Sequence, residues 1–224
     1  MSFFDINNIF FTVLNYSMSY LEFFSVMAGL LAVWLSAKAN IWSWPIGIVN
    51  VSLSFFFYYQ IQLYPDMFLQ IFFFVTNLIG WWRWANPKPE EEDNKLQLKV
   101  SFMKLKHFIL LFVGGIAGTF LIGKMASNLY VWLPFLFNLP SSYPHADSFI
   151  LVMSIITTFL MIKKRIECWI IWIVIDIVAT ILYFIKGAKF FSVEYLIFTL
   201  LAAFGLWNWI REYNGYKIRH ETKS

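Results

Sequence analysis

The sequence of 224 residues has one cysteine, three histidines and few charged residues, which make up 13% of the chain. A single cysteine, Cys168, excludes a disulfide within the chain and any cysteine-based metal site. No Walker loop, nucleophile elbow or His-Glu-x-x-His motif occurs, so we predict neither an enzyme nor a bound cofactor or metal. The N-terminus lacks a basic segment followed by a cleavage site, so no removable signal peptide is expected.

Apolar residues are abundant instead. Hydrophobic residues make up 60% of the chain and aromatic residues 21%, with a mean hydropathy of +0.65. A soluble domain of this length could not cover so much apolar surface, so the surrounding solvent is expected to be a lipid bilayer. The pI near 9.1 does not indicate a nucleic-acid partner, because the basic residues lie between apolar runs and form no patch with aromatic residues.

Seven apolar runs have about the 20 residues that a membrane-spanning helix needs. Their predicted bounds are 20–38, 42–60, 64–84, 107–126, 146–162, 167–186 and 190–210. The sequence therefore predicts an all-α integral membrane protein with seven transmembrane helices. The predicted parts are an interfacial segment (1–19), a first three-helix group (20–86), a hydrophilic linker (87–106), a linker helix (107–126), an external loop (127–144), a second three-helix group (145–211) and a tail (212–224).

Basic residues are distributed unevenly between the two sides that seven spans define. Of the 17 Lys and Arg residues, 14 fall on one side and three, Lys124, Lys186 and Lys189, fall on the other. Because cytoplasmic loops carry an excess of Lys and Arg, we predict a cytoplasmic C-terminus and an N-terminus outside. Six tryptophans near the cytoplasmic span ends are expected to be mostly interfacial anchors: Trp42, Trp44, Trp82, Trp84, Trp207 and Trp209.

The two three-helix groups resemble each other. Residues 20–86 align with residues 145–211 at a constant offset of 125, with 13 identities in 67 positions. Three helices are an odd number, so the fourth helix between the groups gives both the same direction. Internal symmetry in a membrane protein is typical of transporters, whose halves share a site. The fourth helix is expected to pack closely on a neighbour through three glycines, Gly114, Gly115 and Gly118.

Polar and aromatic side chains inside the spans are the candidate ligand contacts. Helical spacing places Trp172, Asp176 and Thr180 on one face. No Lys or Arg lies in the interior of a span, which argues against an anionic substrate. The predicted substrate-binding residues are Asn50, Gln70, Phe73, Asn77, Trp172, Asp176, Thr180, Tyr183, Glu194, Tyr195 and Phe198.

The alternative interpretation is that these polar groups form hydrogen bonds that hold the helices together. We favour that interpretation for Ser54, Thr180 and Thr199. Burial of an amide or acid in lipid is costly, so we favour a functional role for Asn50, Asn77 and Asp176. Asp176 is expected to be either neutral in an apolar site or charged beside a hydrated cavity or a cationic ligand.

Three motifs resemble the PnuC family of bacterial vitamin transporters, whose best-known members carry nicotinamide riboside. They are Trp44-Pro-Ile-Gly-Ile-Val-Asn50, Asn77-x-x-Gly-Trp-Trp-x-Trp84 and Trp207-x-Trp209. The resemblance implies two parallel three-helix bundles joined by a linker helix, as in a full-length SWEET transporter. It also implies a homotrimer in the bacterial inner membrane. Net uptake would follow from phosphorylation of the riboside by a cytoplasmic kinase, which supplies pyridine nucleotide biosynthesis.

Under this resemblance, Trp172 and Tyr195 would contact the flat cationic ring, and Asp176 its positive charge or a hydroxyl. The predicted activity is facilitated diffusion with alternating access. Alternatives are transport of thiamine, riboflavin or a deoxynucleoside, and a proton-coupled symporter in which Asp176 or Glu194 carries the proton. A vitamin-binding subunit of an ATP-driven importer and a membrane enzyme are further alternatives.

Overall fold

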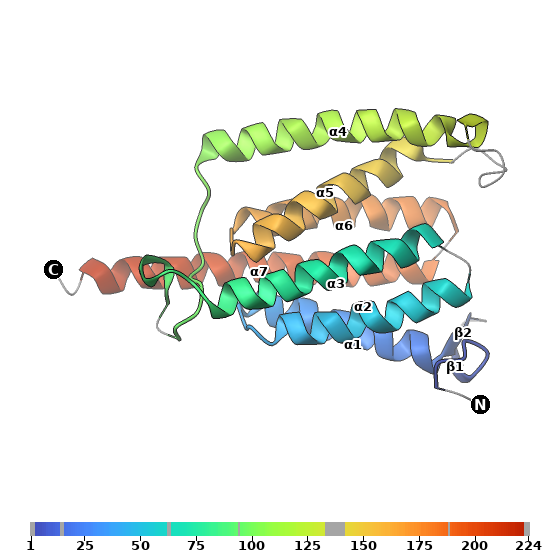
Figure 1. Cartoon of the computed structure of the whole chain (residues 1–224), viewed down its shortest axis with the longest axis horizontal. Helices are drawn as coiled ribbons and strands as arrows, with labels where there is room; N and C mark the ends of the chain where they lie inside the picture. Colours follow the sequence, from blue (N-terminus) through green and yellow to red (C-terminus); the bar gives the residue numbers. More distant parts are fainter. Residues whose placement is uncertain are drawn as a thin grey trace. The chain divides into compact units, whose positions relative to one another are not determined.

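The predicted spans each coincide with a helix in the computed structural model, which describes residues 3–13, 16–61, 64–93, 95–132, 142–187 and 189–221 (Figure 1). The α-helices of these ranges are α1 (Tyr20–Ala37), α2 (Ser43–Gln60), α3 (Tyr64–Ala85), α4 (Leu105–Trp132), α5 (Pro144–Ile162), α6 (Glu167–Ile185) and α7 (Lys189–Glu221). Within the described ranges, five of them are long and apolar enough to cross a membrane: α1, α4, α5, α6 and α7 as far as Tyr216. α2 and α3 contain more polar residues, among them Asn50 and Gln60 of α2 and Asn77 and Arg83 of α3.

The chain forms two compact units. Unit 1 comprises residues 1–99 and contains α1–α3, and unit 2 comprises residues 100–224 and contains α4–α7. In unit 1, α2 packs against both α1 and α3. In unit 2, α4 packs against α5, α5 against α6, and α6 against α7. The predicted linker helix therefore packs as part of the second unit.

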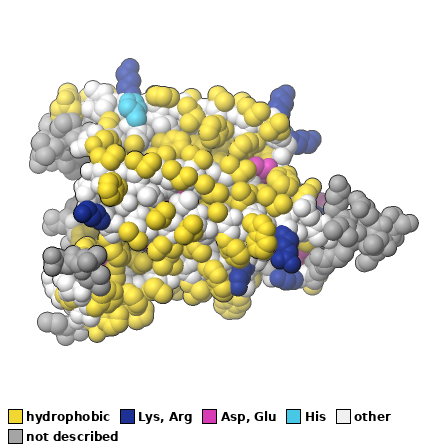
Figure 2. All heavy atoms as spheres, turned by 180° about the vertical axis from the view of Figure 1, so that it is seen from behind, with side chains coloured by type: hydrophobic (Ala, Val, Ile, Leu, Met, Phe, Trp, Pro, Cys, Tyr) yellow, Lys and Arg dark blue, Asp and Glu magenta, His cyan; other side chains and the backbone are white. Residues whose placement is uncertain are grey.

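Large apolar side chains point outward from the helices. Leu110, Phe120 and Leu121 of α4 and Leu200 of α7 are each more than 60% exposed. Figure 2 shows a face on which apolar side chains predominate and Lys and Arg side chains lie toward the margins. An aqueous solvent would disfavour such a surface, whereas lipid accommodates it.

One aromatic contact occurs in both units. Trp44 of α2 packs edge to face on Trp84 of α3, with ring centroids 5.2 Å apart and planes at 89°. Trp169 of α6 packs in the same way on Trp209 of α7, at 5.4 Å and 89°. All four rings are buried, so three of the expected interfacial anchors, Trp44, Trp84 and Trp209, are core residues. The other expected anchors, Trp42, Trp82 and Trp207, are exposed. The difference follows from helical spacing, which turns neighbouring tryptophans to different faces of a helix.

Glycines make room for these rings. A Cβ atom on Gly80 would lie 2.3 Å from the Trp44 ring, and one on Gly205 would lie 2.7 Å from the Trp169 ring. Neither distance is compatible with a side chain, so the helix backbone and the indole ring touch directly.

The turns after α1 and α5 also share a backbone geometry. Ala39 and Lys164, 125 residues apart, have left-handed φ values of 51° and 52°. In each turn the next residue donates its N–H to a helix carbonyl oxygen five residues earlier, at 3.0 Å. The left-handed residue thus allows a tight reversal into the following helix.

The fourth helix packs through a different set of small residues than expected. A Cβ on Gly115 would lie 2.7 Å from Met153 Sδ of α5, and one on Gly118 would make ordinary contact with Val152 at 3.4 Å. Gly114 has no neighbour within 4 Å among the described residues. The buried residues of α4 are Gly115, Thr119 and Gly123, which recur every four residues and form the face against α5.

The N-terminal segment is a β-hairpin, which the prediction of an interfacial segment did not include. β1 (Ile9–Val13) pairs antiparallel with β2 (Tyr16–Ser19). The Gln60 side chain at the end of α2 donates to Phe4 O at 2.6 Å and accepts from Ile6 N at 3.2 Å. One amide thus fixes the segment before the hairpin to unit 1.

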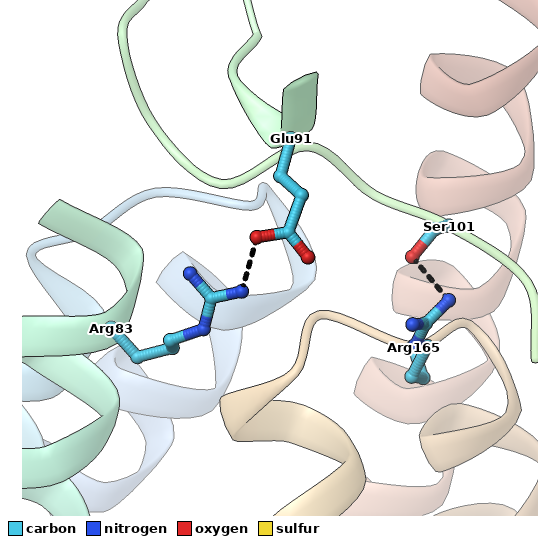
Figure 3. Close-up of polar contacts among 4 residues, drawn as sticks. All are labelled: Arg83, Glu91, Ser101 and Arg165. Carbon is cyan, nitrogen blue, oxygen red and sulfur yellow. Dashed lines mark hydrogen bonds and ion pairs between the residues drawn. The ribbon is translucent and has the colours of Figure 1, made fainter. Parts of the chain in front are cut away.

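The hydrophilic linker is ordered where it leaves unit 1. A short 3₁₀ helix, η1 (Pro89–Glu91), brings Glu91 to Arg83 of α3, with Oε2 and Nη2 2.6 Å apart (Figure 3). Leu98 N donates to Trp84 O at 3.1 Å. The guanidinium of Arg83 lowers the pKa of Glu91 below its usual value.

The linker is also ordered where it enters unit 2. Arg165 donates to Ser101 Oγ at 2.9 Å (Figure 3) and to Phe102 O at 2.8 Å. Met103 N donates to Glu167 Oε1 at 2.8 Å. The turn between α5 and α6 therefore holds the chain that leads into α4.

Three predicted boundaries differ from the structure. α4 begins at Leu105 and continues to Trp132, because no proline or glycine occurs between 124 and 133, so the predicted loop 127–144 is helical at its start. The rest of this loop, 133–141, lies outside the described residues. α7 continues to Glu221 and extends beyond the end of α6 (Figure 1), so the predicted tail 212–224 is largely helical. Its last residues, 222–224, also lie outside the described ranges.

We predict that replacing Gly80 or Gly205 by alanine destabilises the protein. The added methyl group must displace a buried indole, which costs about 1–3 kcal/mol. The measurement is the thermal unfolding temperature in detergent. Gly114→Ala is the matched control, since its Cβ meets open space, and it should unfold at or above the temperature of the unsubstituted protein. Unchanged unfolding of Gly80→Ala would contradict the packing described.

A second prediction concerns the Arg83–Glu91 ion pair. Because the pKa of Glu91 is lowered in the folded protein, the pair contributes stability above the ordinary glutamate pKa of 4.5. That stability is lost as the pH falls through the lower, folded-state pKa. Glu91→Gln should therefore reduce the free energy of unfolding at pH 7 by about 1 kcal/mol or less for this partly exposed pair, and lower the unfolding temperature slightly. Equal stability of the two proteins at pH 7 would show that the pair contributes nothing.

Candidate functional site

A polar cluster joins α1 to α2 in unit 1. The hydroxyl oxygens of Ser25 and Ser54 lie 2.7 Å apart, and Asn50 Nδ2 donates to Ser25 O at 2.8 Å. Gly29 lets the Asn50 amide approach α1, since a Cβ there would lie 3.0 Å from Nδ2. Ser54 thus makes an interhelical hydrogen bond. Asn50 also links the helices, but its Oδ1 accepts no hydrogen bond from the described residues and is a candidate ligand contact.

Asn77 and Gln70 of α3 lie at two different places. Asn77 Nδ2 donates to Phe73 O at 2.7 Å, and its Oδ1 lies against Gly47 of α2, where a Cβ would be 2.3 Å away. Gln70 is buried and lines a groove of about 230 Å³ with residues of α2 and α3. The structure therefore does not bring Gln70 together with Asn50, which faces α1. The groove is lined by Val51, Ser52, Phe55, Phe56, Gln70, Ile71 and Phe74.

In unit 2, Asp176 of α6 is only 4% exposed. No described residue donates a hydrogen bond to its carboxyl group; the Thr180 hydroxyl donates at 2.7 Å to its main-chain oxygen instead. Ser192 Oγ of α7 donates to Thr180 O at 2.9 Å and links the two helices. Trp172, one turn before Asp176, is partly exposed. Burial of a carboxyl group without such a partner is unfavourable, so Asp176 is suited to a ligand that supplies a positive charge or a donor.

Aromatic residues predicted from the sequence come together near the start of α7. The rings of Tyr183 and Tyr195 stack with centroids 5.3 Å apart and planes at 9°. Phe198 lies edge-on to Tyr195 at 6.1 Å, and Phe191 lies 5.6 Å from Tyr183. Glu194 is adjacent to Tyr195 in the chain and is partly exposed.

An ion pair lies beside this stack. Lys186 Nζ, after the end of α6, is 2.7 Å from Asp147 Oδ1 in the first turn of α5. The same ammonium group lies 5.8 Å from the Tyr183 ring and 5.9 Å from the Tyr143 ring. Thus a single cation connects the ends of two helices to the aromatic stack.

Sequence reasoning did not predict several residues of these clusters. Ser25 makes the central hydrogen bonds of unit 1, and Ser192 connects α6 to α7. Asp147 and Lys186 form an ion pair that was not predicted. From the sequence, Lys186 was used only to orient the spans, although the alignment places Asp147 opposite another acid, Glu22. The position of Ser25 one turn after Glu22 on α1 was the available signal, and none pointed to Ser192. The residues that were not predicted are Glu22, Ser25, Asp147, Lys186, Phe191 and Ser192.

Apolar outward-facing helices that enclose polar groups in both units define an α-helical multi-pass membrane protein. A family model described as nicotinamide mononucleotide transporter matches residues 19–211, and the chain belongs to this family. It is therefore a membrane transporter and not an enzyme. The resemblance inferred from the tryptophan and asparagine motifs is confirmed.

Individual relatives agree with this assignment. The chain is 29% identical to the nicotinamide riboside transporter PnuC of Escherichia coli K12, covering 94% of this chain and 95% of that protein. It is 23% identical to the riboflavin/roseoflavin transporter RibM of Streptomyces davaonensis, covering 81% and 80%. A crystal structure of the vitamin B3 transporter PnuC has the same fold, with a TM-score of 0.63 and 23% identity over 86% of this chain and 81% of that one.

We predict that Asp147 and Lys186 are energetically coupled. Asp147→Asn and Lys186→Met should each lower the unfolding temperature in detergent, and the double variant should lose less than the sum of the two. Because both groups are partly exposed, the coupling should be at most about 1 kcal/mol. Strictly additive effects would show that the ion pair does not form in solution.

Proposed function

We propose that the protein takes up nicotinamide riboside by facilitated diffusion. This molecule combines a flat cationic ring, a carboxamide and ribose hydroxyls. The observation that carries the proposal is Asp176, a 4%-exposed carboxyl group whose described neighbours donate no hydrogen bond to it, one turn from the partly exposed Trp172. A cationic aromatic ring can supply the missing charge to the acid and stack on the indole. The name of the curated E. coli relative supports this substrate.

The other candidate residues provide complementary contacts. The Oδ1 atoms of Asn50 and Asn77 offer acceptors for the carboxamide or ribose hydroxyls, and Gln70 offers an amide at the groove lined by α2 and α3. The stack of Tyr183 and Tyr195 provides a flat apolar surface, with Phe198 at its edge. Thr180, Phe73 and Glu194 complete the proposed set.

The proposed mechanism is alternating access between two parallel three-helix repeats, 20–86 and 145–211, joined by α4 as in a full-length SWEET transporter. The matched Trp–Trp contacts, the matched glycines beneath them and the matched left-handed turns support the repeat. The polar positions differ between the repeats, as binding of an asymmetric molecule requires.

We further propose a homotrimer in the bacterial inner membrane, with the N-terminus outside and the C-terminus in the cytoplasm. The 14:3 distribution of basic residues supports this orientation. Net uptake is proposed to come from a cytoplasmic kinase, because phosphorylation removes the riboside from the transport equilibrium.

Two alternatives rest on specific observations. The similarity to the riboflavin/roseoflavin transporter RibM favours another vitamin or nucleoside, such as riboflavin, thiamine or a deoxynucleoside. The buried Asp176 also suits a proton-coupled symporter, in which it or Glu194 carries the proton. The first alternative changes the substrate, and the second changes the response to a pH gradient.

The test is uptake of labelled nicotinamide riboside into proteoliposomes that contain only this protein. Equal final concentrations inside and outside, unaffected by a pH gradient, are expected for a facilitator. Accumulation above equilibrium that follows the proton gradient would establish the symporter instead. Inhibition by riboflavin or thiamine without riboside uptake would establish a different substrate.

We predict that Asp176→Asn weakens riboside uptake. Loss of a charged hydrogen bond of about 1.5–3 kcal/mol should raise the KM for nicotinamide riboside by about 10- to 100-fold. Thr199→Val is the control, because the Thr199 hydroxyl donates to Tyr195 O within its own helix, at 2.9 Å. An unchanged KM in Asp176→Asn would exclude this carboxyl group from the site.

A further inference from the structure

Glu22 is a buried acid outside the set of residues assigned above. It lies in the first turn of α1, a helix apolar enough to span the membrane, and is 6% exposed. Acidic residues in such helices are rare and face a partner, a cavity or a transport pathway. The Tyr16 hydroxyl donates to Glu22 Oε1, and Ser19 Oγ accepts from the Glu22 N–H at 3.2 Å. No described residue donates to Glu22 Oε2.

The acid at the aligned position of unit 2 has a different partner. Asp147, 125 residues after Glu22, forms its ion pair with Lys186 at 2.7 Å. The position that aligns with Lys186 in unit 1 is Ile61. The described residues place no Lys or Arg within ion-pair distance of Glu22. The protein therefore compensates the charge of Asp147 internally, whereas the carboxyl group of Glu22 has a neutral phenol as its hydrogen-bond donor among the described residues.

Aromatic side chains gather around this end of α1. The Phe10 ring of the hairpin lies 4.6 Å from the Tyr20 ring and 5.0 Å from the Phe23 ring, and these two residues lie two positions before and one position after Glu22 in α1. Organic cations are recognised by a carboxylate together with aromatic ring faces, and this end of α1 carries both.

Polar side chains connect Glu22 to the proposed substrate contacts. Ser25 follows Glu22 by one helical turn, so the two share a face of α1. The Ser25 hydroxyl is hydrogen-bonded to Ser54 Oγ, and the main-chain oxygen of Ser25 accepts a hydrogen bond from Asn50 Nδ2. A ligand group that enters beside Glu22 thus meets hydroxyl and amide groups one turn further along the same face.

The geometry points to Glu22 as the residue of unit 1 that recognises the positive charge of an N-linked pyridinium nucleoside, with Tyr16 as the positioning residue for its carboxylate. This assignment rests on the proposed transport of nicotinamide riboside. The N-terminal hairpin then contributes to substrate selection, because it carries the hydroxyl group that orients the acid.

The test compares a cationic and a neutral substrate of nearly the same shape. Initial uptake rates into proteoliposomes are measured for nicotinamide riboside and for its reduced, uncharged dihydro form. Glu22→Gln should raise the KM for the cationic riboside about tenfold or more, equivalent to about 1.4 kcal/mol, and leave the KM for the dihydro form within twofold. The readout is the ratio of the KM for the cationic riboside to the KM for the dihydro form. Tyr16→Phe should also raise this ratio, by a smaller factor than Glu22→Gln, with kcat unchanged.

Two controls separate charge recognition from structural effects. Glu90→Gln removes an exposed acid of η1 and should leave the ratio unchanged. Gln60→Met releases the chain before the hairpin without touching Glu22 and should also leave the ratio unchanged. If Gln60→Met reproduces the effect of Tyr16→Phe, anchoring of the hairpin and not the hydroxyl group is responsible, and the role of Tyr16 is overturned.

The remaining outcomes distinguish the two levels of the proposal. Suppose that the unsubstituted protein carries both ribosides. If Glu22→Gln then weakens uptake of the two forms equally, or weakens uptake of neither form, the assignment of Glu22 is overturned and the proposed function stands. If the unsubstituted protein carries neither riboside, the proposed function fails and the assignment fails with it. Glu22→Asp, which keeps the charge, should restore part of the preference for the cationic riboside.

Discussion

A hydrogen-bonding group inside an apolar helix must find its partner within the protein, because lipid offers none. Several buried or partly buried hydroxyl groups here meet that requirement locally, by donating to the carbonyl oxygen four residues earlier in the same helix. Examples are Thr119, Thr157, Thr158, Thr180 and Thr199. The hydroxyl hydrogens of these residues need no ligand, although a hydroxyl oxygen such as that of Thr180 can still accept a hydrogen bond. The Asp176 carboxyl group has no such local bond and receives no hydrogen bond from the described residues, so it is a candidate site where another molecule can bind.

The two units share the residues that pack their helices together but differ in most of their polar residues. Tryptophan, glycine and left-handed turn positions recur 125 residues apart with nearly the same distances and angles, because they fix how adjacent helices pack. The acid at Glu22 and Asp147 recurs, but Asn50, Asn77 and Asp176 have no polar counterpart at the aligned position. Asn50 bridges α1 and α2 in unit 1, whereas the carboxyl group of the buried Asp176 in unit 2 receives no hydrogen bond from the described residues. Helix packing constrains the tryptophan, glycine and turn positions. The polar positions are not constrained in this way, so they can differ between the units to suit a ligand.

Helix positions were predictable because apolar runs of membrane length leave little choice of structure. Individual contacts between residues were harder to predict from the sequence. The predicted loop 127–144 began too early because hydropathy falls before the helix ends. The faces of α2 could not be assigned from spacing alone: Asn50 contacts α1 whereas Gly47 contacts α3, although both lie near one helical stripe. Which neighbouring helix a stripe meets depends on tertiary packing, which one sequence does not encode in its periodicity.

The hairpin and the ordered linker illustrate the same limit. Their stabilising contacts join residues far apart in the chain, such as Gln60 with Phe4 and Arg165 with Ser101. Local patterns give no indication of such pairs. Composition suggested only that these segments are too polar or too short to span a membrane.

The position of Cys168 has a practical consequence. It is the single cysteine of the chain, it is fully buried in α6, and its sulfur lies 3.9 Å from the sulfur of Met161. A thiol reagent in the surrounding water has no exposed native group to modify. Cysteines introduced one at a time, or one in each unit, would therefore carry fluorescent or spin labels against a silent background, and the separation of the two units could be followed during transport without altering the native residue.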